Sequence, residues 1–354
     1  MPPTLLLKWI DEKRSVHIIR ESPRLLRTLG LTRTGSQPDY SSDLRHGHPT
    51  TMIVRSRPHW LPMLFVLRGS ILPSIAQQLI IITLFATAVT ALHGQILDWK
   101  VSLNFVPFSL IGVSLAIFLG FRNSTSYARY WEARTLWSQV LAASRSLGRQ
   151  ALTLTVSPAV ARPMLLRLCA FAHLLRHELA GTDPAADLRL FLDETDVRRI
   201  LDATQRPAMA LLLASEWLGA RITASELNLS FTAAFERNLH ELSTALAGCE
   251  RIAETPLPFP YSVIIHRCAY LYCFWLPFGL LDGIGLMTPV IVCFIAYTFL
   301  ALEALGAELE NPFGQDPNDL PLKTLSHQIE ASLLEMINEP ARTVRPVVTN
   351  DILT

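Results

Sequence analysis

Few residues of this chain could perform covalent or metal chemistry, and their spacing forms no catalytic site. His173 and His177 stand four positions apart, which places two imidazoles on one face of a helix, where they could hold a metal. No third ligand can be placed beside them. Neither HELAG at 177–181 nor HELST at 240–244 has the HExxH pattern of zinc hydrolases. We therefore interpret the two histidines as part of a packed or solvated helix face.

Signatures of other reactions are also missing from the sequence. It contains no Walker A, GxGxxG or GxSxG motif, and none of its 5 cysteines forms a CxxC pair. The cysteines are interpreted as small buried apolar residues. A net charge of +1 gives no sign of nucleic-acid binding. The sequence therefore predicts no enzyme and no required cofactor.

The most informative stretch is an apolar run that ends at Arg122 and continues as a charged, aromatic-rich helix. Val113, Ile117 and Phe121 recur every four residues and share one helix face. In an oligomer with this helix around its axis, they could form a narrow apolar neck that gates by dewetting. The alternative is that the three side chains face lipid or a neighbouring helix.

A second row of small residues lies one position before this stripe. Gly112, Ala116 and Gly120 have the spacing that lets membrane helices approach closely. We expect this row to mediate packing of the pore helices against each other.

Composition indicates that these rows belong to a membrane protein. Half of the 354 residues are hydrophobic and only 17% are charged, against about a quarter in average soluble domains. A helix needs about 20 apolar residues to cross a bilayer. Three runs are long enough, and a fourth is if its helix begins near Tyr261. We expect two hairpins built from spans at 71–92, 101–121, 261–281 and 283–302.

The distribution of basic residues sets the expected topology. The short hairpin loops at 93–100 and around Asp282-Gly283 would share one side, and nearly all Lys and Arg lie on the other. The positive-inside rule then places both termini of this multi-pass protein in the cytoplasm.

The regions outside the spans carry helical patterns and no strand patterns. We expect the pore helix to continue to about Arg149, with further helices near 161–181, 185–203, 206–219, 224–253 and 323–337. The expected fold is an all-α membrane protein with four transmembrane helices and a cytosolic helical bundle. Its parts are the first transmembrane hairpin with the neck helix at 52–123, a cytosolic region at 124–258, the second hairpin at 259–308 and a C-terminal segment at 309–354. Residues 1–51 are expected to be a disordered extension, with Met52 as the native start.

Four separated blocks resemble the bacterial branch of the bestrophin family. They are RGSILP at 68–73, FLGFRNSTSYARYWEARTLW at 118–137, AGCERIAETPLPFPYSVIIHRCAYLYCFWLPFGLLD at 247–282 and ENPFGQDPNDLPL at 310–322. The resemblance implies a homopentameric channel in the lipid bilayer that conducts small monovalent ions passively through one axial pore. It also implies three apolar neck rings set by the triplet Leu119-Gly120-Phe121, which here are Val113, Ile117 and Phe121.

The same resemblance implies a second constriction near the cytosolic exit, for which Glu241 and Leu242 are the candidates. A ring of Glu241 side chains would favour cations. We therefore expect Na⁺ and K⁺ slightly ahead of chloride, with an anion channel of the same fold as the alternative. A secondary transporter and a membrane-anchored scaffold are further alternatives. They would predict broken helices with midplane polar sites or repeats, and a monomer without ion flux, respectively.

The family also implies a calcium clasp after the last span. Its candidate ligands here are Glu308, Asn311, Asp316 and Asp319, because dense oxygen ligands suit Ca²⁺. Pro317 and Asn318 replace part of the family's acidic run and lower the local charge. The alternative is that these side chains cap the helix and fix a turn.

Overall fold

The computed structural model describes residues 52–53, 59–63, 66–67, 69–93, 95–96, 99–100, 105–314, 316, 318–346, 348–349 and 352–353. The expected extension at 1–51 lies outside the described residues, as do positions 101–104 of the second expected span.

The described residues are mostly helical. The helices are α2 Trp60–Met63, α3 Leu72–Ala91, α4 Phe105–Leu154, α5 Pro158–Ala180, α6 Ala185–Phe191, α7 Glu194–Leu201, α8 Arg206–Thr223, η1 Leu229–Phe231, α9 Thr232–Glu254, α10 Phe259–Ile284, η2 Gly285–Met287, α11 Thr288–Glu310 and α12 Leu322–Glu335. Two-residue strands form two small antiparallel sheets, one of β2 Gln95–Ile96 with β3 Trp99–Lys100 and one of β1 Met52–Ile53, β5 Ile352–Leu353 and β4 Val348–Thr349.

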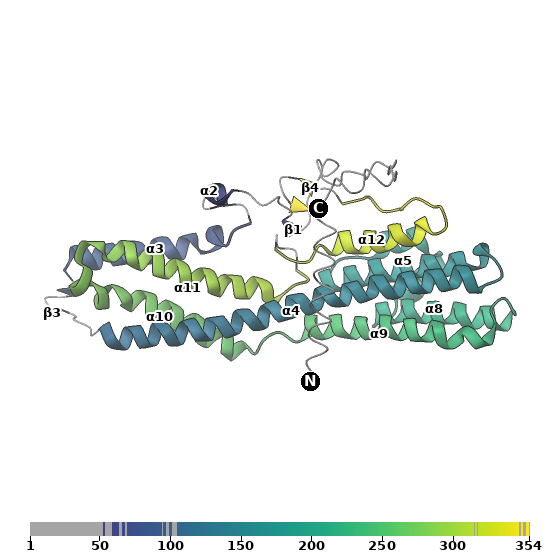
Figure 1. Ribbon diagram of the computed structural model, residues 1–354, viewed down its shortest axis with the longest axis horizontal. Coiled ribbons are helices and arrows are strands. Elements are labelled where there is room, and N and C mark those ends of the chain that lie inside the picture. Colours follow the sequence, from purple (N-terminus) through teal and green to yellow (C-terminus); the bar gives the residue numbers. More distant parts are fainter. Residues whose placement is uncertain are drawn as a thin grey trace, which may run out of the picture. The chain divides into compact units, whose positions relative to one another are not determined.

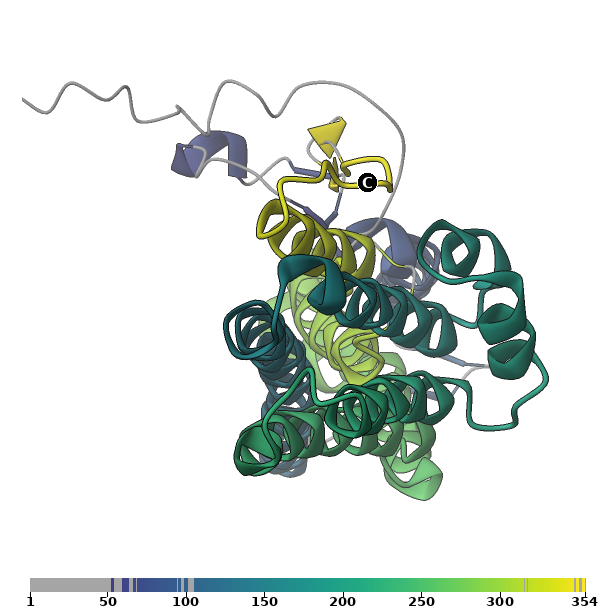
Figure 2. The ribbon, with the colours of Figure 1, turned by 90° about the vertical axis from the view of Figure 1, so that its right-hand side faces the viewer.

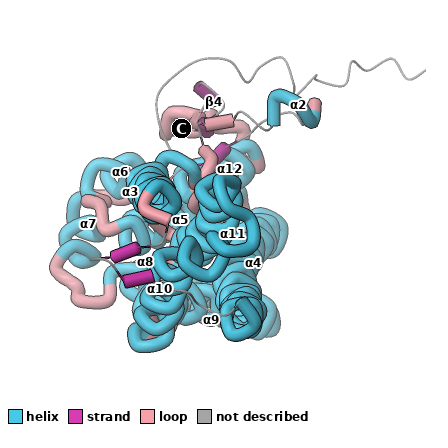
Figure 3. The backbone as a smooth tube through the Cα atoms, turned by 90° about the vertical axis from the view of Figure 1, so that its left-hand side faces the viewer, coloured by secondary structure: helices cyan, strands magenta, loops and turns pink. Residues whose placement is uncertain are grey.

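One group of apolar helices, here the membrane group, consists of α3, the first part of α4, α10 and α11. Proline in the first turn of α3, α10 and α11 suits a helix start, where the missing N–H would have no partner. These helices share one hydrophobic core, and Figure 3 shows them from one end. The turn expected at Asp282-Gly283 falls later, because α10 runs to Ile284 and the chain reverses through Gly285 at φ +56°. The last span accordingly begins at Thr288.

The membrane-group helices are less buried within the chain than a further apolar helix, α5. Among the described residues, four helical stretches are long and apolar enough to cross a membrane: Leu72–Ala91, Val106–Leu154, Pro158–Ala180 and Phe259–Glu310, the last of which contains both α10 and α11. In Pro158–Ala180, 67% of the most apolar window is buried inside the chain, against 17–28% in the others. A helix that the chain itself covers has little surface left for lipid, so α5 is a core helix and not a span.

The second group, here the helical bundle, consists of the rest of α4 with α5 to α9 and α12. The central helix α5 packs against α4, α6, α8, α9 and α12 (Figure 2). The single helix expected at 185–203 is two helices, because Leu192 is extended and the Asp193 side chain accepts the Asp196 N–H at 2.8 Å to cap a new start. The helix expected at 224–253 begins only at Thr232, after η1.

The helix α4 belongs to both groups. Its 50 residues correspond to about 75 Å of unbroken helix. It packs against α10 and α11 in the membrane group and against α5, α9 and α12 in the bundle (Figure 1). The apolar run and the charged helix that follows Arg122 therefore form one continuous element, as expected.

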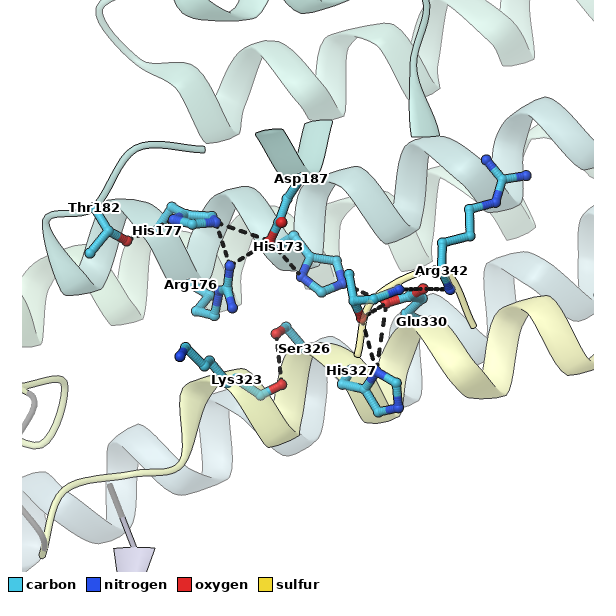
Figure 4. A network of polar contacts seen from close by, with 11 residues as sticks. His173, Arg176, His177, Thr182, Asp187, Lys323, Ser326, His327, Glu330 and Arg342 are labelled. Atoms are coloured by element: carbon cyan, nitrogen blue, oxygen red, sulfur yellow. Dashed lines mark hydrogen bonds and ion pairs between the residues drawn. The ribbon is translucent and has the colours of Figure 1, made fainter. Parts of the chain in front are cut away.

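A buried polar network fastens the segment after α12 to the bundle (Figure 4). The Glu330 carboxylate accepts hydrogen bonds from the backbone N–H groups of Arg342 and Thr343 and from the Thr343 hydroxyl. His173 of α5 lies on the other side of this carboxylate, with Nε2 at 2.9 Å from Oε2. Its Nδ1 lies 3.5 Å from Asp187 of α6. His177 contacts the same Asp187, with Nε2 at 3.1 Å from Oδ2, so both spaced histidines of the sequence belong to a structural network.

Candidate functional site

The predicted neck residues lie on the face of α4 that the rest of the chain leaves open. Val113, Ile117 and Phe121 are 60%, 51% and 63% exposed. Leu115 and Leu119 lie on the opposite face and are buried in the core of the membrane group. One side of α4 is therefore packed inside the subunit, and the stripe is available to a lumen, to lipid or to another subunit.

The small-residue row divides into two parts. A Cβ atom at Gly112 would lie 2.6 Å from the hydroxyl oxygen of Tyr272 on α10, so this glycine serves packing within the subunit. Ala116 and Gly120 are exposed, and no atom of the described structure lies within 4 Å of the position of a Gly120 Cβ. Only the Ala116 and Gly120 end of the row is open to a second copy of the chain.

The predicted cytosolic constriction needs a correction at Leu242. This side chain is fully buried in the core of the bundle, so it has no surface with which to line a pore. Glu241 is exposed on the same helix. The spacing of Phe235, Leu239, Leu242 and Leu246 is that of a buried helix face, and this signal could have assigned Leu242 to the core from sequence.

The predicted calcium ligands fold into a turn with internal hydrogen bonds. Asn318 Nδ2 donates to Glu308 Oε2 at 2.7 Å, and Asp319 Oδ2 accepts the Asp316 N–H at 2.7 Å. The Asp319 side chain is buried behind Gly314, and burial raises its pKa to about 6, with smaller contributions from the charges of Asp316 and Glu308.

In the residues that the structure describes, this arrangement favours a hydrogen-bonded turn over a preformed calcium site. Within the part of the chain that the structure describes, no group of three or more His, Cys, Asp or Glu side chains could hold a metal ion. One oxygen of Asp319 and one of Glu308 are already engaged within the turn, by the Asp316 N–H and by the Asn318 side chain. The geometry agrees with the alternative in which these residues fix a turn.

A buried arginine next to the predicted neck was not identified from the sequence. Arg122 follows Phe121 directly, and its side chain forms ion pairs with Glu303 and Glu310 of α11. Arg122 and Glu303 each interrupt an apolar run, which is the signal that could have paired them, because charges inside or beside membrane spans are seldom left unpaired.

The fold defines an all-α membrane protein in which one apolar helix, α4, continues into a helical bundle. Residues 52–335 match the family model described as "Bacterial/Fungal Bestrophin protein". The chain belongs to the bestrophin family, which is a family of membrane channels and not of enzymes. The resemblance found in the four sequence blocks is therefore confirmed.

This chain matches relatives of known sequence over almost the whole length of each relative. The voltage-dependent anion channel-forming protein RSc3414 of Ralstonia nicotianae is 46% identical over 82% of this chain and 96% of its own length. The voltage-dependent anion channel-forming protein YneE of Escherichia coli K12 is 42% identical over 81% of this chain and 95% of its own. A crystal structure of a bacterial bestrophin homologue from Klebsiella pneumoniae is 41% identical, with a TM-score of 0.73 over 75% of this chain and 99% of that one.

Proposed function

We propose that the chain forms a homopentameric channel in which five copies of α4 surround one axial pore. The observation that carries this proposal is the stripe of Val113, Ile117 and Phe121, which faces away from the other helices of its own subunit. These side chains would form the neck. Monovalent ions would pass it only when it is wetted, because an apolar constriction gates by excluding water.

The continuity of α4 supports a lumen over lipid as the environment of this stripe. Lipid accepts any apolar face, and α11 has such a face with Val290 and Phe294 exposed. Only α4, among the described helices, runs on from the membrane group into the helical bundle. A pore along α4 would therefore lead an ion from the membrane to the far end of the bundle.

The exposed part of the small-residue row supports contact between neighbouring pore helices. Ala116 and Gly120 lie beside the stripe on the same helix and are open in the single subunit. Small side chains let helices pack closely in a bilayer. In the proposed pentamer they would be covered by the next subunit, and the bulkier stripe would turn toward the axis.

Two ion charges are supported by different observations. The exposed Glu241 favours cations, because a ring of five carboxylates at a constriction attracts positive ions. The relatives from Ralstonia and Escherichia are named as anion channel-forming proteins, which favours chloride. We retain Na⁺ and K⁺ as the proposed ions and chloride as the second candidate. For location we propose a bacterial inner membrane with both termini in the cytoplasm, on the asymmetry of Lys and Arg.

Single-channel recording in planar bilayers tests the neck. Ile117→Ala and Phe121→Ala should raise the unitary conductance, because smaller side chains widen the neck and let water in. Phe294→Ala is the matched control, since Phe294 is 69% exposed but lies on α11. Equal conductance in all three variants and the unaltered protein would refute this placement of the neck.

Reversal potentials in asymmetric NaCl decide the ion charge in the same recordings. A reversal potential on the cation side that moves toward zero in Glu241→Gln would support both the ion and the residue. A reversal potential on the anion side would replace the first candidate by chloride. The mass of the complex in detergent checks the number of subunits.

A further inference from the structure

The strongest feature outside the neck stripe itself is a buried ion-pair cluster directly beside it, here called the anchor: Arg122, Glu303 and Glu310. Nη1 of Arg122 lies 3.3 Å from Oε1 of Glu303, and Nη2 lies 3.5 Å from Oε2 of Glu310. The Arg122 side chain is only 4% exposed. A buried guanidinium is strongly unfavourable without its partners, so the orientation of this side chain toward α11 is fixed.

The two carboxylates of the anchor are themselves held by other elements. Glu310 Oε1 accepts the N–H of Leu257, which lies in the connection between α9 and α10, at 3.1 Å. Glu303 Oε1 lies 3.4 Å from Nδ1 of His266 on α10. Arg122 therefore binds groups whose positions are set by α10, α11 and the α9–α10 connection together.

A second arginine repeats this attachment about two turns further along α4. Arg129 donates to the backbone carbonyls of Ile252 and Thr255, each at 2.7 Å, and to the carbonyl of Glu310 at 3.2 Å. Two contacts spaced along one helix restrict both sliding and rotation about its axis. The absence of a side chain at Gly306 brings α11 close to α4 here, since a Cβ atom at that position would collide with Asn123.

The direction of Phe121 depends on this attachment. Successive residues of a helix point about 100° apart, so fixing Arg122 toward α11 also fixes the direction of Phe121. If the stripe points at the pore axis, as proposed above, a rotation of α4 that carries Phe121 off the axis switches the neck from closed to open.

We infer that Arg122 is a positioning residue of the channel, which through Glu303 and Glu310 sets the rotation of α4 and so holds Phe121 in the neck. This inference rests on the proposed function. It assigns to the anchor the fraction of time for which the neck is open, and to the stripe the conductance of the open neck.

The test compares Arg122→Gln and Glu303→Gln with two controls in planar bilayers. Each anchor variant should raise the open probability roughly fivefold or more, with the unitary conductance unchanged. Because Glu303 acts through Arg122, the double variant should raise the open probability no further than Arg122→Gln alone.

The controls separate positioning from stability and from the proposed function. Arg167→Gln breaks a partly buried ion pair of the helical bundle, at 3.1 Å to Asp196, and should lower the melting temperature while leaving the open probability unchanged. Phe121→Ala should change the unitary conductance.

If the anchor variants have the same open probability as Arg167→Gln while Phe121→Ala alters the conductance, the inference is wrong and the proposed neck is still supported. If Phe121→Ala also has no effect, the proposed function fails first. Glu303→Gln, which keeps the shape of the side chain, remains informative if Arg122→Gln does not fold.

Discussion

The two hydrophobic cores of the chain differ in how completely one subunit fills them. In the helical bundle, α5 is surrounded by other helices, and 67% of its most apolar window is buried. In the membrane group this share is only 17–28%, and large apolar side chains such as Phe294 and Val290 stay exposed. The bundle can therefore complete its core alone, whereas the membrane group needs lipid or other subunits to cover it.

The buried polar networks of the two regions differ in the same way. In the bundle, Glu330 and His173 join α12 and α5 of one subunit and tie down the segment after α12. In the membrane group, the anchor at Arg122 joins α4 to α11 beside an exposed stripe. The first network closes a finished core, and the second fixes a helix whose other face is still open. This difference separates residues that maintain the fold from residues that can control a pore.

The largest expected effect is on stability, when one phenylalanine is truncated in the bundle and another in the membrane group. Phe171 of α5 is 1% exposed and Phe294 of α11 is 69% exposed. Phe171→Ala should cost about 3–5 kcal/mol of unfolding free energy, because it leaves a cavity in a packed core. Phe294→Ala should cost far less in detergent, where micelle replaces the lost contact. Thermal unfolding followed by circular dichroism measures both. Equal losses would show that Phe294 is covered by protein in the assembly and would break the comparison.

A smaller effect is expected from the buried carboxylate of the bundle. Burial by itself would raise the pKa of Glu330, but hydrogen bonds from His173, Thr343 and the backbone of Arg342 lower it from 4.5 to about 2. Because the folded pKa lies below the unfolded one, the stabilisation is complete above pH 4.5 and is lost as the pH falls toward 2. It is on the order of 3 kcal/mol at neutral pH.

Glu330→Gln should therefore lower the melting temperature at pH 7 and flatten its decline between pH 4.5 and the acid limit. Glu335→Gln is the control, since Glu335 is exposed on the same helix. Melting curves of both variants from pH 7 to pH 3 give the answer. An unchanged acid decline in Glu330→Gln would show that this network does not govern the acid stability of the bundle.

The smallest expected effects come from two open glycines. No described atom lies within 4 Å of a Cβ placed on Gly120 of α4 or on Gly219 of α8. Gly219→Ala should stabilise the bundle by about 0.5–1 kcal/mol, because alanine loses less backbone entropy in a helix. Gly120→Ala should give the same gain only if its surface stays open.

A neighbouring pore helix at Gly120 would change this result. The added methyl group would then reduce the fraction of assembled channel seen by size-exclusion chromatography, without loss of helical content. Equal stabilisation and unchanged assembly in both variants would place the interface between subunits elsewhere.

Helical content and family could be predicted well from the sequence, because apolar periodicity and four motif blocks are local properties. The positions of the apolar helices were predicted to within several residues. One shift lies at the Gly285 turn, where Asp282 and Gly283 remain helical, and α11 runs on to Glu310. The pattern of α4 also predicted correctly that Val113, Ile117 and Phe121 share a face. Whether that face lines a pore stays a prediction.

The candidate sites were less predictable, because they depend on contacts between distant segments. Leu242 was assigned to a constriction, but it is buried in the core of the bundle, where α9 packs against α4, α5 and α8. Gly112 was grouped with Gly120, but Tyr272 covers only the first. The acidic residues after α11 suggested a metal site, and the fold joins Glu308 to Asn318 and Asp319 to the backbone of Asp316.

The sequence by itself determined the class of the protein, the spans and the residues that share each helix face, because these follow from composition and helical period. Tertiary structure alone decided which face of α4 the subunit covers and which it leaves open. It also brought Arg122 to Glu303 and Glu310, 181 and 188 positions away along the chain. A helical period fixes directions around one axis, but only the packing of several helices decides what each direction meets.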